Sequence, residues 1–181
     1  SGLLEWTESN ADAILAHDPS TLATLVGQSV TLKARVVAGD ERETAADGGR
    51  ALLNLGHTYA HAIETLAGVG KLGSDDPGLQ HGEAVAIGLV AALAAGERLG
   101  TSDGALTRRA VALLERPGLP TGATGLPPAS ELIGAMFYDN KTVGGRLRLI
   151  APSGVWQVRR APDPAAGAVC AGPAAHAAPG P

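Results

Sequence analysis

The pattern of apolar and polar positions predicts a chain built mainly of helices. Apolar residues recur at helical spacing over 2–16 and again over 20–37, where Ser20 is the expected N-cap. A third helix is expected over 52–64 and a fourth from His81 to Leu99. Shorter amphipathic helices are expected over 105–116 and from Ser130 to Lys141.

The same pattern predicts which side of each N-terminal helix is buried. The first helix should turn apolar residues inward and acidic residues to solvent, and the second should pack its apolar residues against the rest. The expected inward positions are Leu3, Leu4, Ile14, Leu15, Leu22, Leu25, Val26, Val30 and Leu32, and the expected solvated acids are Glu5, Glu8 and Asp12.

The C-terminal part of the chain departs from helical spacing. Apolar residues alternate over 144–158, which predicts a short strand pair. From about Ala161 the chain consists largely of Ala, Pro and Gly and has almost no large apolar side chain, so it cannot bury enough surface to order itself. We therefore expect one helical domain over 1–160 and a disordered tail over 161–181, where Cys170 and His176 are not counted as ligands.

Composition narrows the range of partners. The chain has 181 residues with 45% hydrophobic content, enough for one sizeable core. Its 14 basic and 18 acidic residues do not suggest a nucleic-acid surface. No apolar run reaches membrane-spanning length and no signal peptide is visible. With a single cysteine the chain has no disulfide framework, and a cytoplasmic location is expected.

The segment LLNLGHTYAHAIE, residues 52–64, combines an apolar helical face with an unusual density of ionisable groups. Its apolar stripe comprises Leu52, Leu55, Tyr59 and Ile63, and the polar positions beside it are Asn54, His57, His61 and Glu64. Two imidazoles one turn apart can hold a divalent metal or an anion, and they can equally be hydrogen-bonded core histidines. Glu64 is a candidate acceptor that orients an imidazole.

Two further observations bear on this segment. A zinc-protease helix needs Glu directly after the first histidine, and Thr58 occupies that position, which disfavours a protease. His81 opens the next helical run after a Gly-rich loop, so it is a candidate third ligand or substrate group. A helix start also favours anions, because free amide groups and the helix dipole point there.

The blocks DERE, RALLNLGHTYAHAIE, HGEAVAIG, DNK and GGRLRL follow one another in an order that resembles the C-terminal domain of 3-dehydroquinate synthase, in the sugar phosphate cyclase superfamily. The resemblance covers about residues 1–150. It implies a mainly α multi-helix domain with a short β hairpin near its end. It also implies that the family's N-terminal Rossmann-like domain, which binds most of the NAD, is absent from this chain, as is the family's glutamate metal ligand.

The resemblance assigns roles to individual residues. It places His57 and His81 at metal-ligand positions, for zinc or cobalt, and separates His61 from the metal by placing it with the substrate. The implied substrate-binding set is Lys33, Arg50, Asn54, His61 and Lys141, and the implied catalytic set is Glu43, His61 and Lys33. The sequence departs from the family in TAADGG, a longer connection at 44–49, in a longer loop at 68–79, and in Asn140, which stands where a lysine is usual.

The implied enzyme converts the seven-carbon keto-sugar acid phosphate DAHP to 3-dehydroquinate in the shikimate pathway, with transient oxidation by NAD and loss of phosphate. The complete enzyme is expected to be a homodimer, and the present chain alone is expected to be inactive unless a separate nucleotide-binding half joins it. Alternatives are another cyclase (aminodehydroquinate, 2-deoxy-scyllo-inosose or valiolone type), a metal-dependent polyol dehydrogenase domain, or a non-catalytic remnant.

Overall fold

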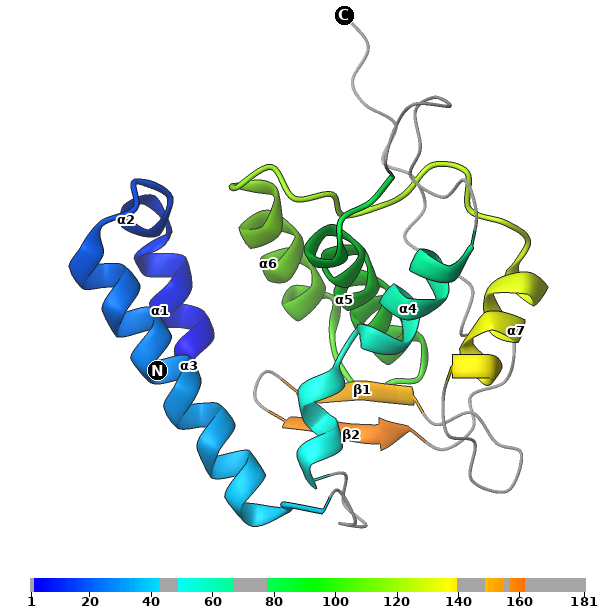
Figure 1. Ribbon diagram of the computed structural model, residues 1–181, viewed down its shortest axis with the longest axis horizontal. Helices are drawn as coiled ribbons and strands as arrows, with labels where there is room; N and C mark the ends of the chain where they lie inside the picture. The colour runs from blue at the N-terminus through cyan, green and yellow to red at the C-terminus, as the bar shows by residue number, and fades with distance from the viewer. Residues whose placement is uncertain (1, 43–48, 67–77, 140–148, 155–156, 162–181) are drawn as a thin grey trace, which may run out of the picture.

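The computed structural model describes residues 2–42, 49–66, 78–139, 149–154 and 157–161. Figure 1 shows two parts: helices α1 to α3 stand to one side, and the remaining helices surround α5. The mainly helical fold expected from the sequence is confirmed, and so is the short hairpin near its end. None of the helices in the described ranges is long and apolar enough to cross a membrane.

The N-terminal segment forms two short helices instead of the single helix expected over 2–16. Helix α1 (Leu3–Ser9) is followed by α2 (Ala11–Leu15), with Asn10 between them. The Asn10 side chain donates to the Trp6 carbonyl oxygen at 2.8 Å. The Asn10 backbone amide donates to the carbonyl oxygens of Trp6 and Thr7. A polar side chain that competes for backbone partners in this way interrupts a helix.

Helix α3 (Pro19–Gly39) begins two residues earlier than expected, because its N-cap is Asp18 instead of Ser20. The Asp18 carboxylate accepts bonds from the Ser20 hydroxyl at 2.7 Å and from the Thr21 amide at 2.8 Å. These bonds lower the pKa of Asp18 to about 2, and the bond from the Ser20 hydroxyl has the largest effect. Pro19 at the first helical position has no amide hydrogen to satisfy, which suits it to this place.

The apolar face of α3 is not buried as expected. Val26, Val30 and Leu32 are 59%, 61% and 50% exposed, and Leu15 of α2 is also exposed. The main contacts of α3 are with α1, α2 and η1, at one side and one end of the helix. Helical spacing located the apolar stripe correctly, but the helix has no neighbour in the described structure that covers all of it.

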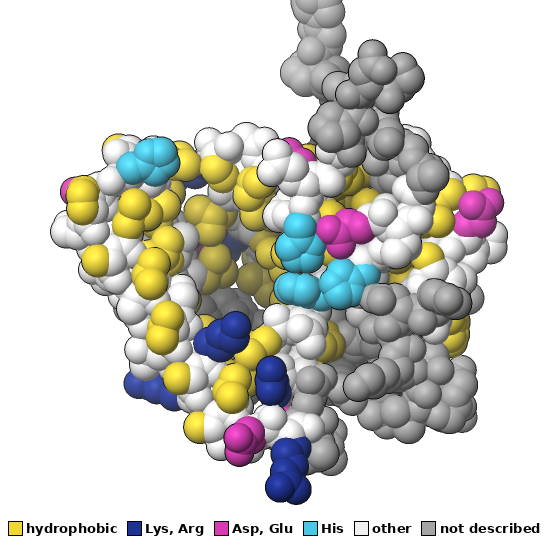
Figure 2. Space-filling model, in the orientation of Figure 1, with side chains coloured by type: hydrophobic (Ala, Val, Ile, Leu, Met, Phe, Trp, Pro, Cys, Tyr) yellow, Lys and Arg dark blue, Asp and Glu magenta, His cyan; other side chains and the backbone are white. Residues whose placement is uncertain are grey.

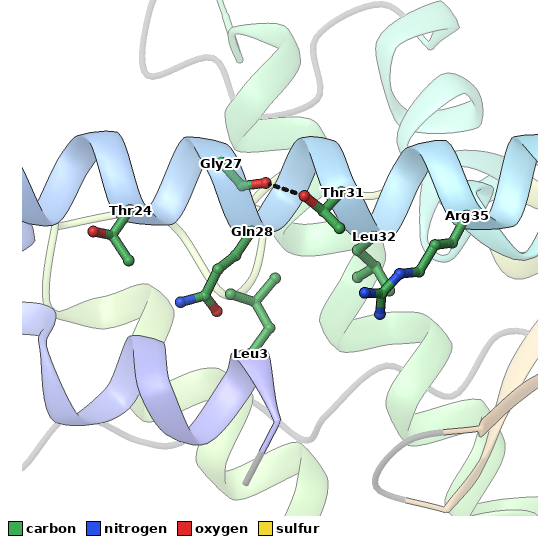
Figure 3. Close-up of a pocket in the computed structure, with 7 residues that line it drawn as sticks. All are labelled: Leu3, Thr24, Gly27, Gln28, Thr31, Leu32 and Arg35. Carbon is green, nitrogen blue, oxygen red and sulfur yellow. Dashed lines mark hydrogen bonds between the residues drawn. The ribbon is translucent and has the colours of Figure 1, made fainter.

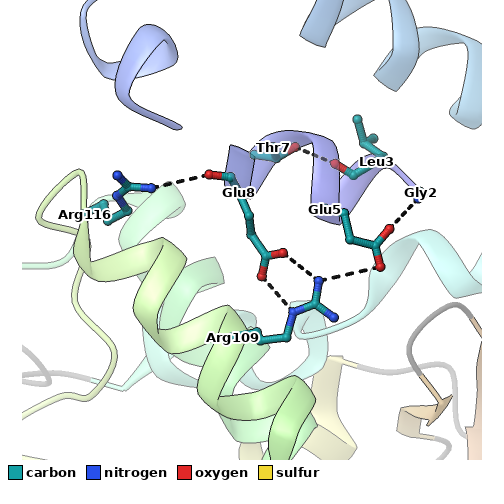
Figure 4. Close-up of polar contacts among 7 residues, drawn as sticks. All are labelled: Gly2, Leu3, Glu5, Thr7, Glu8, Arg109 and Arg116. Atoms are coloured by element: carbon teal, nitrogen blue, oxygen red, sulfur yellow. Dashed lines mark hydrogen bonds and ion pairs between the residues drawn. The ribbon is translucent and has the colours of Figure 1, made fainter. Parts of the chain in front are cut away.

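Two arginines connect the N-terminal part to α6 (Gly104–Glu115) and its C-terminal end. Arg109 donates to both carboxylate oxygens of Glu8, at 2.8 and 2.6 Å, and lies 3.8 Å from a Glu5 oxygen (Figure 4). Arg116 donates to Asp12 at 2.6 Å. Glu5 and Glu8, expected to face solvent, are partly covered by Arg109, because α6 packs beside α1 in the folded chain. Asp12 pairs with Arg116, but its side chain stays 91% exposed, as expected.

Helix α5 (His81–Arg98) is the centre of the larger part. It packs against α4 (His57–Thr65), against α6, and against strand β1 (Leu149–Gly154), while α7 (Ala129–Asp139) packs on α4. The main core cluster joins α4, α5, α7 and β1 through Tyr59, Ala62, Ala92, Ala95, Met136 and Leu149. Strand β1 pairs antiparallel with β2 (Gln157–Ala161), with Leu149 opposite Ala161.

The most buried side of α5 consists largely of small residues. Ile87 and Leu93 are buried as expected, whereas Val85, Leu89 and Leu99 are only half-buried. Ala84, Gly88, Ala92 and Gly96 are buried with them. Small side chains let neighbouring backbones approach closely. The elements around α5 can therefore pack directly against its backbone.

Candidate functional site

The segment expected as one helix over 52–64 is divided at Gly56. A 3-10 helix, η1 (Gly49–Asn54), precedes it, and α4 begins directly after it at His57. Gly56 has a φ of 83°, in the left-handed region that favours glycine. A Cβ atom at this position would lie 2.6 Å from the Leu89 amide nitrogen, so the turn also needs glycine for close contact with α5.

Three histidines from two helices gather at one place. The ring centroids of His57 and His61 are 6.0 Å apart, those of His57 and His81 are 6.2 Å apart, and those of His61 and His81 are 6.3 Å apart. Figure 2 shows the histidine cluster on the surface beside a hollow, with Lys and Arg side chains on the lower side of the same face. His57 and His61 are half-buried and His81 is exposed.

Glu64 lies against this cluster. Its Oε1 atom is 2.9 Å from Nδ1 of His81, so the last full turn of α4 is bonded to the first residue of α5. The expectation that Glu64 contacts an imidazole is confirmed, and the partner is His81. Nδ1 of His57 lies 3.5 Å from the Leu55 carbonyl oxygen, at the outer limit of hydrogen-bond length.

The donor set suits a borderline metal ion. Imidazole nitrogens are common ligands of zinc and cobalt, and carboxylates commonly hold the other ring nitrogen. Two imidazoles on one tetrahedral zinc, with Zn–N distances of about 2 Å, have ring centroids about 5 Å apart. The present spacing is slightly wider, and within the described residues no group of three or more His, Cys, Asp or Glu side chains is already arranged to enclose a metal. Small side-chain torsion changes cover the difference, so the residues fit such an ion.

The junction between α3 and η1 holds the expected substrate-binding arginine. Asp40, which is 8% exposed, accepts a bond from the Arg50 amide at 3.1 Å. The Arg50 guanidinium donates from Nη1 to the Glu41 carbonyl oxygen at 3.2 Å. Asn54 ends η1 with an exposed side chain, two residues before Gly56. Arg50 and Asn54 thus lie on the short segment that leads directly into the histidine helix.

Lys33 lies on α3, with its side chain exposed. Helix α3 continues to Gly39, and Lys33 lies before its last turn, which has no basic residue. Arg35 borders a pocket of about 490 Å³ between α1 and α3, which sequence reasoning did not identify. Figure 3 shows Gln28, Leu32 and Arg35 on one side of α3, with Leu3 of α1 opposite Gln28.

Two of the expected site residues, Glu43 and Lys141, lie outside the described residues, as do most of the two longer connections and most of the C-terminal tail. Their placement therefore stays a sequence-based expectation. Sequence reasoning also did not single out Arg109, whose pairing with Glu8 joins residues 101 positions apart. Spacing along one element carries no signal for a contact between two distant elements.

Comparison with known proteins identifies the family. The model of the family described as 3-dehydroquinate synthase C-terminal matches residues 1–142. The chain belongs to this family. Since the match includes both helices of the histidine cluster, it covers the region where the structure gathers His57, His61 and His81.

Two solved structures have the same fold as this 3-dehydroquinate synthase C-terminal domain. One is ValA, a 2-epi-5-epi-valiolone synthase from Streptomyces hygroscopicus subsp. jinggangensis 5008 with NAD+ and Zn2+ bound; its TM-score is 0.72 and its identity 19%, over 92% of this chain and 44% of that one. The other is a 2-deoxy-scyllo-inosose synthase complexed with carbaglucose-6-phosphate, NAD+ and Co2+; its TM-score is 0.61 and its identity 22%, over 80% of this chain and 40% of that one. The chain therefore spans less than half the length of these relatives.

Proposed function

We propose that this chain is the metal- and substrate-binding domain of a sugar phosphate cyclase, with His57 and His81 as its metal ligands. The observation that carries the proposal is the convergence of His57, His61 and His81, which places a residue that opens α5 beside two residues of α4. The bound Zn2+ and Co2+ of the two relatives support a divalent metal in this domain.

The other residues of the site bind and orient an anionic substrate. Lys33, Arg50 and Lys141 supply positive charge for phosphate or carboxylate groups, and Asn54 and His61 supply hydrogen bonds. The exposure of Lys33 and Arg50 supports this role, because both charges are open to a ligand from solution. A neutral polyol would not require three cations, which favours a sugar phosphate over the substrate of a polyol dehydrogenase.

The proposed reaction is the conversion of the heptulosonate phosphate DAHP to 3-dehydroquinate, a step of aromatic amino acid biosynthesis in the cytoplasm. Glu43 and His61 hold and transfer protons at the reacting alcohol and at the departing phosphate. Lys33 and Arg50 stabilise the negative charge of the leaving group. When bound, the metal would supply Lewis acidity at the substrate oxygens, and NAD, held mainly by the other domain of the proposed homodimeric enzyme, would supply reversible hydride transfer.

A second cyclase reaction is favoured by specific observations. Both relatives are cyclitol-forming synthases, and one holds carbaglucose-6-phosphate. The sequence Asp139-Asn140-Lys141 has asparagine in place of the usual lysine, a pattern that resembles aminocyclitol-forming members of the superfamily. The alternative substrate is therefore a sugar phosphate without a carboxylate, which needs one cation fewer.

Metal titration tests the site. In calorimetry with Zn2+, His57→Ala and His81→Ala should each weaken binding, since each removes a ligand. His17→Asn is the matched control, because His17 is an exposed histidine between α2 and α3 and its φ of 57° is one that asparagine tolerates. Zinc binding that is unchanged in both cluster variants would contradict the proposal. Comparing heptulosonate phosphate with carbaglucose-6-phosphate, each titrated into the zinc-loaded chain, separates the two substrate classes.

A further inference from the structure

The contact between Glu64 and His81 joins the two helices of the histidine cluster. Glu64 belongs to α4 and His81 is the first residue of α5, and the bonded atoms, Oε1 and Nδ1, are 2.9 Å apart. The side chain of His81 is 61% exposed, so packing does little to hold its ring, whereas that of Glu64 is only 29% exposed. The carboxylate is therefore the main restraint that the structure shows on the ring.

The bond determines which nitrogen of His81 is available. An ionised carboxylate can only accept, so Nδ1 of His81 carries the hydrogen and donates it to Oε1 of Glu64. In the neutral ring the free lone pair is then on Nε2. His57 has a backbone acceptor, the Leu55 carbonyl oxygen, near the same nitrogen. At 3.5 Å this contact holds the His57 ring less firmly than Glu64 holds the His81 ring.

A second carboxylate at the start of α5 does not compete for this role. Glu83 is only two residues from His81, but its Oε2 atom accepts a bond from the Gln80 amide at 2.7 Å as part of a capping box. This bond satisfies one of the free amides at the helix start. Of these two carboxylates, Glu64 is the one that contacts the imidazole of His81.

We propose that Glu64 is a positioning residue: it fixes the tautomer and orientation of His81 so that Nε2 is presented to the metal. The inference rests on the proposed function of the histidine cluster. It adds a residue that does not touch the metal itself but determines how one ligand meets it. Carboxylates that hold the second nitrogen of a ligating histidine change metal affinity by roughly tenfold to a hundredfold when they are removed.

The first test needs no metal. Nitrogen chemical shifts of the imidazoles, measured by NMR on the metal-free chain at mildly alkaline pH, report which nitrogen of His81 carries the hydrogen. We expect the Nδ1–H form in the wild type and loss of this preference in Glu64→Ala. Glu64→Gln keeps an acceptor oxygen and should retain it in part. The same tautomer mixture in wild type and Glu64→Ala would overturn the proposal.

The second test is calorimetry with Zn2+. We expect Glu64→Ala to weaken binding by about tenfold to a hundredfold and Glu64→Gln to weaken it less. Glu97→Gln is the matched control, since it removes the same charge from an exposed glutamate at the far end of α5, about 24 Å along the helix from His81. Melting temperatures of all variants should stay near that of the wild type, because an ion pair with one exposed partner, here His81, contributes little to stability.

The outcomes separate the two proposals. If His81→Ala weakens zinc binding and Glu64→Ala does not, the cluster binds metal but Glu64 does not position its ligand, and only the present inference fails. If neither substitution changes zinc binding, the metal site itself is wrong and both proposals fail. If Glu64→Ala loses zinc affinity and its melting temperature also falls clearly, while its His81 tautomer is unchanged, the role of Glu64 is purely structural. That result would also overturn the inference.

Discussion

Gly56 and Gly88 bring α4 and α5 into direct backbone contact. The Cα atom of Gly88 faces the Gly56 carbonyl oxygen, and a Cβ atom at Gly88 would also lie 2.9 Å from the Ala60 amide nitrogen. The histidines lie one to five residues beyond Gly56 on α4, and His81 lies seven residues before Gly88 on α5. The spacing within the histidine cluster therefore depends on this contact.

The first prediction is that Gly88→Ala destabilises the fold and loosens the cluster. The added methyl group has no space, and overpacking of this kind costs about 1–3 kcal/mol in the free energy of unfolding. Gly134→Ala is the matched control, because Gly134 is a helical glycine of α7 with no atom within 4 Å of an added Cβ. The control should be neutral or stabilising. Denaturant unfolding of both variants measures the difference, and equal stability would contradict the close contact.

The second prediction concerns the junction of α3 and η1. Asp40→Ala removes the buried acceptor of the Arg50 amide and should lower the free energy of unfolding by about 1 kcal/mol. It should also weaken binding of a sugar phosphate, because the bond to Asp40 holds the backbone of Arg50 in place. Asp40→Asn keeps an acceptor oxygen and is the matched control. Chemical denaturation measures stability and calorimetry measures binding; identical behaviour of the Ala and Asn variants would show that the bond is unimportant.

The third prediction is an acid-sensitive contact between α1 and α6. The hydrogen bonds from Arg109 lower the pKa of Glu8 below its ordinary value. A carboxyl whose pKa is lowered by folding stabilises the folded state above its unfolded pKa, and this stabilisation is lost as the pH falls through the folded pKa. Protection factors of the α1 amides, which correct for the pH dependence of intrinsic exchange, should therefore fall as the pH drops below the ordinary glutamate pKa of about 4.3.

Substitution of the arginine tests the cause of this acid sensitivity. In Arg109→Gln the α1 amides should exchange faster at neutral pH as well, and the acid-dependent step should shrink. Arg108→Gln is the control, since Arg108 is the neighbouring exposed arginine of α6. An unchanged acid step in Arg109→Gln would assign it to another group.

The fourth prediction separates the roles of His57 and His61. His57→Ala should reduce metal occupancy, whereas His61→Ala should leave it near the wild-type level and weaken binding of a sugar phosphate to the zinc-loaded chain. In the complete enzyme, loss of the His61 imidazole should slow turnover by roughly a hundredfold or more. Metal analysis and melting temperature measure the first two effects. Equal metal loss in both variants would indicate that the three rings, which are nearly equidistant, all serve as ligands.

Several features followed from local sequence alone. The spacing of apolar residues located α3, α5, α6 and α7 within one or two residues, because helical periodicity is a property of neighbouring positions. The alternation after residue 144 likewise indicated the hairpin of β1 and β2. The histidine-rich segment and the position of His81 marked the site, because residue type and order along the chain were sufficient to show the resemblance to the family.

The break between η1 and α4 was decided by tertiary structure. Local spacing favoured one continuous helix over 52–64, but the close approach of Gly88 places Gly56 in a left-handed conformation and starts a new helix at His57. The exposure of Val26 and Val30 on α3 was decided in the same way. A hydrophobic stripe shows that a helix can be covered, while the neighbouring elements determine whether it is.

By itself, the sequence determined the helical class and the family, and it named the candidate residues for binding a metal or an anion. Only the tertiary structure decided that Glu64 contacts His81 and that Glu8 contacts Arg109. The physical reason is that side-chain periodicity places residues on one face of one element, whereas these contacts join elements that are distant in sequence. They depend on how α4 meets α5 and how α1 meets α6, which the packing of the whole domain determines.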